Sequence, residues 1–338
     1  MTSLSIGRPR LALAAALVLA AALGGCGNKA SESGGGGDYP SRNLTLIAPA
    51  DPGGGWDMTA RAFQQAIKDG KLTDKNVEVR NVPGAGGTIG LSRFVSKEKG
   101  DSSQLMIMGL VMIGAIETND SATDLTQVTP IATLTTETEA VVVRAKSKYK
   151  TIKDLMADLK KDPGSVSVAG GSAGSTDQLL LGLMAKDVGA DPAKTKYVAY
   201  SGGGEAKTAM LSGSVAAGIT GLGEIADQVE AGKMRLLAVS SDTAQKVAGK
   251  TPPTLKDSGY DVEITNWRGV VAAPGIPDAD LEGITSFVGK VRGSAGWKAA
   301  LKKNGWTDFY KTGDDYKTFL DSETTRVKAT VDDLGLGK

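Results

Sequence analysis

Residues 44–64 read LTLIAPADPGGGWDMTARAFQ, which predicts a short strand, a glycine turn and the start of a helix. The strand is Leu44–Ala48, the turn holds Gly53–Gly55, and the helix covers Met58–Ile67. The first backbone N–H groups of a helix have no partner inside the helix and lie at the positive end of its dipole. A glycine turn at this position is therefore a place where an anion can bind.

The same pattern of strand, glycine turn and helix occurs three more times in the chain. The later turns are Gly84–Gly87, Gly170–Ser175 and Gly202–Gly204, and each lies between an apolar segment and a helix-like one. Regular alternation of apolar strands with helices predicts an α/β fold with largely parallel sheets. Ligands of open α/β sheets bind beyond the carboxyl ends of the strands, which is where these turns lie.

The middle of the chain contributes further elements. Thr129–Leu134 and Ala140–Arg144 read as two separate strands. Thr151 is a plausible N-cap for a helix over Ile152–Lys160, with Asp154 in the first turn of that helix. Asn266–Ala273 is again strand-like, and most of the chain beyond it reads as helical.

Composition excludes several kinds of chemistry. The 338 residues include no histidine, which removes Ser-His-Asp and Cys-His catalysis and the commonest metal ligand. Cys26 is the single cysteine, so no disulfide and no cysteine metal cluster can form within the chain. The 39 Lys and Arg residues balance 38 Asp and Glu, which gives no support to nucleic-acid binding. We expect no catalytic residue, no cofactor and no metal site.

The N-terminus reads as an export signal over residues 1–25. Arg8 and Arg10 precede an apolar run, Leu11–Leu23, that is short for a membrane span. Leu23-Gly24-Gly25-Cys26 resembles the lipobox of bacterial lipoproteins, in which the cysteine is lipidated and becomes the first mature residue. Residues 26–40 then read as a flexible Gly/Ser tether, so we expect an exported protein that is lipid-anchored on the extracytoplasmic face. An ordinary secretion signal with an incidental cysteine is the alternative.

A nucleotide is one alternative ligand for the glycine turns. Gly84–Gly90 is close to a Rossmann fingerprint, but its third glycine falls one residue late and no acidic residue ends the next strand, Gln104–Met108. Tyr149 and Lys153 have the Tyr-x-x-x-Lys spacing of some dehydrogenases, within or beside a charged, surface-like run. A nicotinamide-dependent oxidoreductase is therefore an alternative function that lacks a complete motif.

A carboxylate fits the turns better. None of the four turns contains Lys or Arg, which favours binding by dipoles and hydrogen bonds over direct ion pairs. A helix N-terminus favours an anion by about 0.3–2 kcal/mol, whereas micromolar binding needs about 8 kcal/mol. Nearby hydroxyl groups, together with a closure that expels water, would have to supply the difference.

Four side chains near the turns have two interpretations each. Asp57 is spaced i,i+4 from Arg61, as in a pair on a helix surface, or it contacts the ligand. Trp56 packs on the domain or forms a wall or lid for the ligand, and we favour the second. Glu205 is most simply an acid in a first helical turn, and Asp177 is an N-cap or a ligand contact.

The motifs resemble those of a known family, the substrate-binding proteins of tripartite tricarboxylate transporters. Ala48–Asp57 with Ala60-Arg61 is similar to the family's first motif, and Asn81–Gly90 is similar to its second. Further similar segments are Tyr200–Ala206, Arg235–Val239, Pro253–Leu255 with Gly259-Tyr260, and Asn266–Val270 with Ala273–Gly275. The resemblance spans about Leu44 to Gly335, nearly the whole predicted mature chain.

The resemblance implies a two-lobed α/β protein with the type II fold of periplasmic binding proteins. The lobes, joined by crossing strands, would be 41–140 with 266–338 and 141–265, and they would close on a small organic anion. The first two loops would hold one carboxylate through backbone N–H groups and bridging water. The loaded protein, expected to be a monomer, would deliver its ligand to a permease with a large and a small membrane subunit. A lipoprotein sensor of carboxylates is the alternative role.

Two features of the motifs bear on the ligand. The Gly-Gly-Gly-Trp-Asp form resembles the branch associated with tricarboxylates such as citrate, and a dicarboxylate is the other candidate. Gln178 stands where many members have histidine, so no ligand contact is carried over to it. The residues expected to bind the ligand are Gly53, Gly54, Gly55, Trp56, Asp57, Gly84, Ala85, Gly86, Gly87, Ser172, Ser175, Thr176, Asp177, Gly202, Gly203, Gly204, Glu205 and Thr220.

Overall fold

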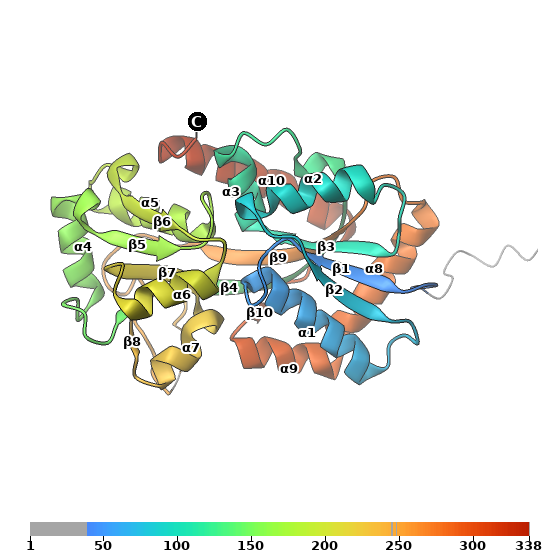
Figure 1. Cartoon of the computed structure of the whole chain (residues 1–338), viewed down its shortest axis with the longest axis horizontal. Coiled ribbons are helices and arrows are strands. Elements are labelled where there is room, and N and C mark those ends of the chain that lie inside the picture. Colours follow the sequence, from blue (N-terminus) through green and yellow to red (C-terminus); the bar gives the residue numbers. More distant parts are fainter. Residues whose placement is uncertain (1–38, 245, 248, 338) are drawn as a thin grey trace, which may run out of the picture. The chain divides into compact units, whose positions relative to one another are not determined.

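The computed structural model of the chain describes residues 39–244, 246–247 and 249–337 (Figure 1). The predicted signal peptide (1–25), Cys26 and nearly all of the predicted tether (26–40) lie outside these residues. Within the described part, none of the helices combines the length and the apolar character that a membrane span requires.

The strands of the described residues form a mixed sheet in the order β2-β1-β3-β9-β4-β7-β5-β6, with β8 and β10 also paired to β4. Strands β1, β2 and β3 are parallel, as are β5, β6 and β7, but β4 and β9 are antiparallel to their neighbours. The expectation of largely parallel sheets therefore holds only for the two ends of the sheet. The strands are β1 (Leu44–Ala48), β2 (Val77–Asn81), β3 (Gln104–Gly109), β4 (Thr129–Arg144), β5 (Ser167–Gly170), β6 (Lys196–Ala199), β7 (Ala217–Gly221), β8 (Met234–Val239), β9 (Thr265–Ala272) and β10 (Thr307–Asp308).

The long strand β4 joins the two ends of the sheet. The sequence predicted two strands here, and this was wrong: one strand of 16 residues runs through Thr129–Arg144. It pairs with β9 as far as Thr138 and with β7 from Glu139 onward. Its polar stretch, residues 135–139, interrupts the apolar pattern yet lies mostly buried at this crossing point. The crossing strand therefore places charged side chains inside the protein.

Helices cover the faces of the sheet (Figure 1). Thr151 caps α4 as predicted: its hydroxyl accepts a hydrogen bond from the Asp154 amide at 3.3 Å, and Asp154 accepts one from the Thr151 amide at 2.9 Å. The helices are α1 (Gly55–Gly70), α2 (Thr88–Lys97), α3 (Leu110–Thr118), α4 (Ile152–Lys161), α5 (Thr176–Asp187), α6 (Gly203–Ser212), α7 (Leu222–Glu230), α8 (Asp278–Gly293), α9 (Ala295–Asn304) and α10 (Gly313–Asp333).

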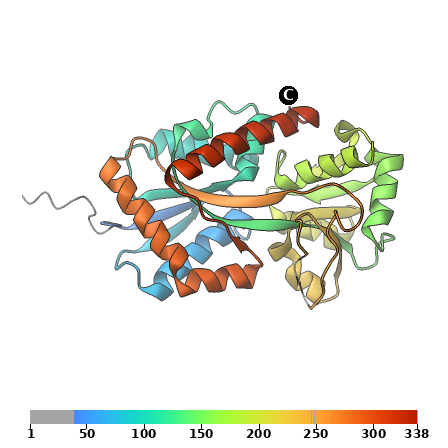
Figure 2. The same ribbon diagram turned by 180° about the vertical axis from the view of Figure 1, so that it is seen from behind.

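The C-terminal helix α10 reaches from α3 to α5 across the central strand β4. It packs against α3 and β4, and Figure 2 shows it, in dark red, running along the sheet. Just beyond its end, Leu334 fills the space beside Gly182 of α5, and Lys186 of α5 forms an ion pair with Asp333. The two lobes are therefore also connected through α10, and the lobe boundaries at 140/141 and 265/266 stay a prediction.

Candidate ligand cleft

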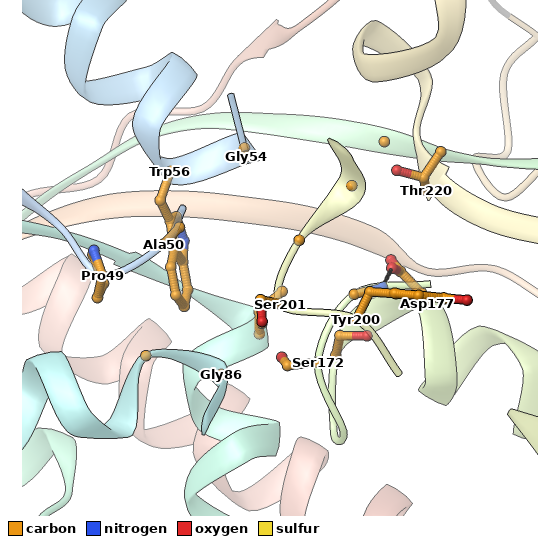
Figure 3. Close-up of a pocket in the computed structure, with 18 of the residues that line it drawn as sticks. Pro49, Ala50, Gly54, Trp56, Gly86, Ser172, Asp177, Tyr200, Ser201 and Thr220 are labelled. Atoms are coloured by element: carbon orange, nitrogen blue, oxygen red, sulfur yellow. Dashed lines mark hydrogen bonds between the residues drawn. The ribbon is translucent and has the colours of Figure 1, made fainter. Parts of the chain in front are cut away.

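A cavity of about 240 Å³ lies where the predicted glycine turns meet (Figure 3). Its walls come from the turns after β1, β2, β5, β6 and β7, together with two residues of β9. This volume is below the range of about 300–1,000 Å³ typical of ligand pockets, which favours a small ligand. A larger depression of about 650 Å³ beside α3 and α10 is lined by none of the predicted site residues.

Most of the predicted site residues line this cavity. They are Gly54, Gly55, Trp56, Gly84, Ala85, Gly86, Gly87, Ser172, Ser175, Asp177, Gly202, Gly203 and Thr220. Five others, namely Gly53, Asp57, Thr176, Gly204 and Glu205, do not line it. Thr176 is fully buried, and Glu205 is an exposed acid in the first turn of α6, as its simpler interpretation predicted.

The carboxylate of Asp57 stabilises the first turn through hydrogen bonds. Its Oδ2 accepts hydrogen bonds from the Gly53 amide at 2.8 Å and from Arg61 Nε at 2.9 Å, and its Oδ1 accepts one from Asn81 Nδ2 at 2.9 Å. Burial raises the pKa of Asp57, but these hydrogen bonds and the charge of Arg61 outweigh burial, so the pKa lies below its ordinary value. The Arg61 pair was predicted correctly, but it is no surface pair, because Asp57 is only 2% exposed.

In the first turn, two backbone amides come before the first hydrogen bond of helix α1. Gly54 donates to the Asp51 carbonyl at 3.1 Å, and the first helical bond of α1 runs from Met58 to the Gly54 carbonyl at 2.9 Å. The amides of Gly55 and Trp56 come before that bond, at the positive end of α1. Both residues line the cavity.

The second turn has the same property. Its first bond runs from the Gly87 amide to the Gly84 carbonyl at 2.9 Å, so the amides of Ala85 and Gly86 come before it. Gly87 has a φ of 92°, and a Cβ built there would lie 2.6 Å from Cζ3 of Trp56. The indole ring, 6% exposed, therefore packs on the second turn while also lining the cavity. The packing interpretation of Trp56 is confirmed, and its contact with the ligand stays a prediction. We call Gly55, Trp56, Ala85 and Gly86 the amide wall.

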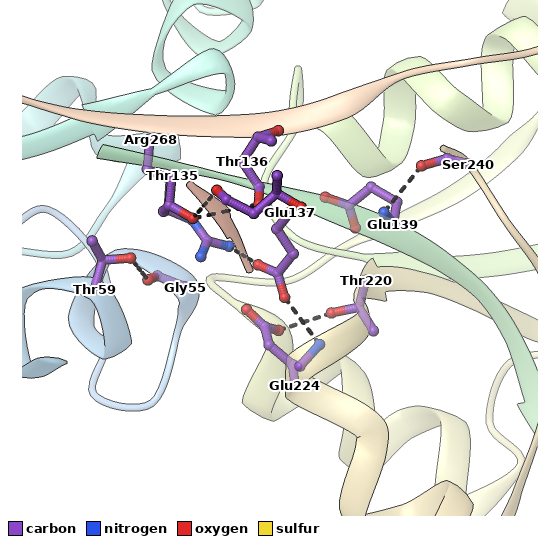
Figure 4. Close-up of polar contacts among 12 residues, drawn as sticks. Gly55, Thr59, Thr135, Thr136, Glu137, Glu139, Thr220, Glu224, Ser240 and Arg268 are labelled. Atoms are coloured by element: carbon purple, nitrogen blue, oxygen red, sulfur yellow. Dashed lines mark hydrogen bonds and ion pairs between the residues drawn. The ribbon is translucent and has the colours of Figure 1, made fainter. Parts of the chain in front are cut away.

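The turns of the second lobe carry carboxylates of the protein itself (Figure 4). Asp177 Oδ2 accepts a hydrogen bond from the Gly171 amide at 2.5 Å, ahead of α5. Glu224 Oε2 accepts one from the Thr220 hydroxyl at 2.8 Å and lies against the start of α6, where a Cβ at Gly203 would overlap it. Both carboxyl groups line the cavity, and we call Asp177 and Glu224 the acidic wall.

Two more acids lie behind this wall, on the polar stretch of β4. Glu137 accepts a hydrogen bond from the Gly223 amide at 3.0 Å, at the start of α7, and forms an ion pair with Arg268 of β9. Within the described residues, no donor reaches either carboxylate oxygen of Glu139. Arg268 lines the cavity, is 2% exposed, and lies 5.3 Å from the ring centre of Trp306.

Burial changes the protonation of these acids. Burial and the neighbouring charge of Asp177 raise the pKa of Glu139 well above its ordinary value. Burial raises the pKa of Asp177 to about 6, against the hydrogen bond from Gly171, and raises that of Glu224 to about 7. The acidic wall therefore gains negative charge near neutral pH, opposite an amide wall that has none.

Several lining residues were not among those predicted from the sequence: Pro49, Ala50, Val111, Gly171, Ala199, Tyr200, Ser201, Gly221, Glu224, Asn266 and Arg268. Most flank a predicted turn. Arg268 had one available signal, because its charge lies inside a strand-like segment, residues 266–270. Charges inside a strand that is buried on both faces need partners.

The oxidoreductase alternative gains no support from this geometry. Tyr149 and Lys153 do not line the cavity, and the Tyr149 hydroxyl donates to Asp158 at 3.0 Å beside α4. Within residues 39–337 as described, no group of three or more His, Cys, Asp or Glu residues is arranged to hold a metal ion.

Comparison with known proteins identifies relatives over most of the chain. Protein BugT of Bordetella pertussis is 27% identical over 307 residues, which cover 88% of this chain and 90% of BugT. A TctC solute binding protein from Polaromonas is 26% identical, with a TM-score of 0.63 over 87% of this chain and 99% of that one. MatC from Rhodopseudomonas palustris, solved with bound malate, is 20% identical with a TM-score of 0.75 over 87% of this chain and all of MatC, which shows the fold alone.

The predicted two-lobed fold of periplasmic binding proteins is thus confirmed. The profile of the family described as "Tripartite tricarboxylate transporter family receptor" matches residues 59–336. This match covers most of the chain, and the protein therefore belongs to that family.

Proposed function

We propose that this protein is a solute receptor that binds a small carboxylate between its lobes and delivers it to a membrane permease, without catalysis. One observation carries the proposal: two glycine turns place helix-start amides on the same side of one cavity. Membership of the transporter receptor family supports delivery to a permease with a large and a small subunit. MatC, which shares the fold, was solved with malate, a small dicarboxylate.

The amide wall suits a carboxylate for a physical reason. Each helix start contributes about 0.3–2 kcal/mol toward an anion, so two of them supply part of the roughly 8 kcal/mol that micromolar binding requires. The Ser172 hydroxyl lies at the same cavity and close to Gly86, where it can donate a further hydrogen bond. Contact between Trp56 and the ligand would exclude water and strengthen these polar interactions.

The test is a ligand screen by thermal shift and calorimetry. Tricarboxylates such as citrate, dicarboxylates, monocarboxylates with and without amino groups, nucleotides and nicotinamide cofactors are compared at equal concentration. A true ligand at one hundred times its Kd stabilises the protein by about 2.7 kcal/mol. Stabilisation by carboxylates supports the proposal, whereas stabilisation by nucleotides alone contradicts it and favours the oxidoreductase.

The proposal includes export and a lipid anchor at Cys26, both of which concern residues outside the described part. Cys26→Ser is expected to move the protein from the membrane fraction to the soluble fraction, whereas the control Ser33→Ala leaves it in place. Membrane retention of Cys26→Ser would contradict lipidation.

Gene deletion in cells distinguishes a transport receptor from a sensor. Deleting the gene of a transport receptor abolishes uptake of the labelled ligand, whereas deleting that of a sensor changes only the response to it. We expect loss of uptake and a monomeric receptor, the latter measured by light scattering.

A further inference from the structure

The charge of Arg268 acts on Glu224, but the acidic wall has no ion-pair partner within the described residues. Within the described residues, neither Asp177 nor Glu224 takes part in an ion pair. Arg268 is paired with Glu137. Lys207, on α6, donates from Nζ to the backbone carbonyl of Glu224 at 3.1 Å, and so does not pair with the carboxylate.

Asn266 of β9, which lies opposite Glu137 of β4, also lacks a hydrogen bond to its side-chain oxygen within the described residues. This side chain lines the cavity and is 8% exposed. Together with the carboxylates of Asp177 and Glu224, it makes a set of acceptors. An ammonium group has three donors and no acceptor, and so matches such a set.

We propose that the ligand carries a positively charged amino group as well as a carboxylate, with the carboxylate on the amide wall and the amino group on the acidic wall. This inference rests on the proposed function and narrows its ligand class to small amino carboxylates. A second carboxylate in the same place would face two groups of like charge and would need an added proton. Citrate, which the first turn favours by resemblance, therefore fits this half of the cavity poorly.

Matched pairs of compounds test the inference on the whole folded protein. Succinate is compared with aspartate, glutarate with glutamate, and propionate with β-alanine, each by calorimetry at pH 7.5. We expect the amino member of at least one pair to bind ten-fold or more tightly than its partner. Glu224→Gln keeps the size of the side chain and its acceptor for Thr220, and is expected to weaken the amino compound at least ten-fold.

Two further variants complete the comparison. Asp177→Asn is expected to weaken binding of the amino compound, as Glu224→Gln does. Thermal melts establish that both variants fold. Glu230→Gln, at the exposed end of the same helix α7, is the control and leaves the affinity unchanged.

The pH dependence separates an amino group from a protonated second carboxyl. The groups that face the acidic wall are Glu137 and Glu139 of β4 and Arg268 of β9, with Lys207 of α6 beside it. Between pH 5.5 and 8 the wall loses protons, so binding of an amino carboxylate strengthens and binding of a dicarboxylate weakens.

The outcomes distinguish the two proposals. If dicarboxylates bind more tightly than their amino partners and Glu224→Gln does not weaken the amino compounds, this inference is overturned while the receptor function stands. If no carboxylate of any kind binds, the proposed function itself fails.

Discussion

The glycine turns of the two lobes share one sequence pattern but line the cavity with different groups. In the first lobe, the amides of Gly55 and Trp56 precede the first hydrogen bond of α1 and belong to the cavity wall. In the second lobe, Asp177 accepts the amide of Gly171, and Glu137 accepts the amide of Gly223. Asp57 of the first lobe likewise accepts the amide of Gly53, but it does not line the cavity, whereas Asp177 does. The proposed place for an anion of the ligand is therefore the amide wall, and the second lobe presents anions of the protein to the cavity.

This difference shows that a glycine turn before a helix does not by itself identify an anion site. The acid that occupies such a turn can come from far away in the sequence: Glu137 lies 86 residues from Gly223. Whether the amides at a helix start are available to a ligand depends on which side chains the tertiary fold places beside them. The second lobe accordingly presents carboxyl groups to the cavity where the pattern alone predicted amides.

The largest expected effect comes from removing Arg268, the ion-pair partner of Glu137. Arg268→Met leaves Glu137 and Glu139 buried without a positive charge, and breaking a buried pair in this way costs about 3–5 kcal/mol. We therefore expect a large decrease in the free energy of unfolding, measured by urea denaturation.

The double variant Glu137→Gln/Arg268→Met is the matched control for that experiment. It removes both charges, so it should be clearly more stable than Arg268→Met alone. Equal stability of the single and the double variant would show that the pair contributes nothing to holding the two strands together.

The second effect concerns the other side of the cavity. Trp56 was expected to form a wall or lid for the ligand, but its ring is also nearly buried against Gly87. We now expect two losses, namely ten-fold or more in ligand affinity and about 2–4 kcal/mol in stability, which is less than a complete core truncation. Leu211→Ala, a partly exposed apolar position on α6, is the control for both measurements. An unchanged Kd would reduce Trp56 to a packing residue.

The sequence predicted the fold well because its strongest signals are local. Apolar periodicity placed β1 and α1, and the Thr151 and Asp154 pair placed the start of α4. The glycine turns likewise located most of the cavity wall. The continuity of β4 was missed because residues 135–139 are polar, and polar residues in a strand usually indicate its end or an exposed face.

The acidic wall could not be predicted for a different reason. Glu224 reads as an ordinary first-turn acid of α7, and Arg268 as one charge within a strand. Their importance arises only when β4, β9 and the start of α7 meet, since burial beside one another is what shifts their protonation. No local sequence pattern predicts contacts between segments that lie so far apart in the chain.

The two lobes should also respond to pH in opposite directions. The pKa values of Asp177 and Glu224 are raised from 3.8 and 4.5 to about 6 and about 7, so the folded state binds their protons more tightly than the unfolded state does. Their contribution to stability is fully present below about pH 4 and is lost as the pH rises through about 6 and 7. Glu224→Gln should reduce this loss in melting temperature between pH 5 and pH 8. An unchanged slope would show that Glu224 titrates as an ordinary exposed acid.

The smallest effect is expected from the carboxylate that supports the first turn. The pKa of Asp57 is lowered, so its stabilisation is present above the unfolded value of 3.8 and is lost as the pH falls through the folded value. Asp57→Asn removes the charge that Arg61 binds and one of the acceptors for Gly53 and Asn81, which should cost about 1–2 kcal/mol at pH 7.

Because Asp57 does not line the cavity, any loss of affinity must act through the position of the Gly55 and Trp56 amides. Asp57→Asn should therefore weaken every carboxylate by the same factor, whereas Glu224→Gln discriminates between compounds with and without an amino group. If Asp57→Asn also discriminates between them, the two walls are not independent, and the division of the cavity into an amide side and an acidic side is wrong.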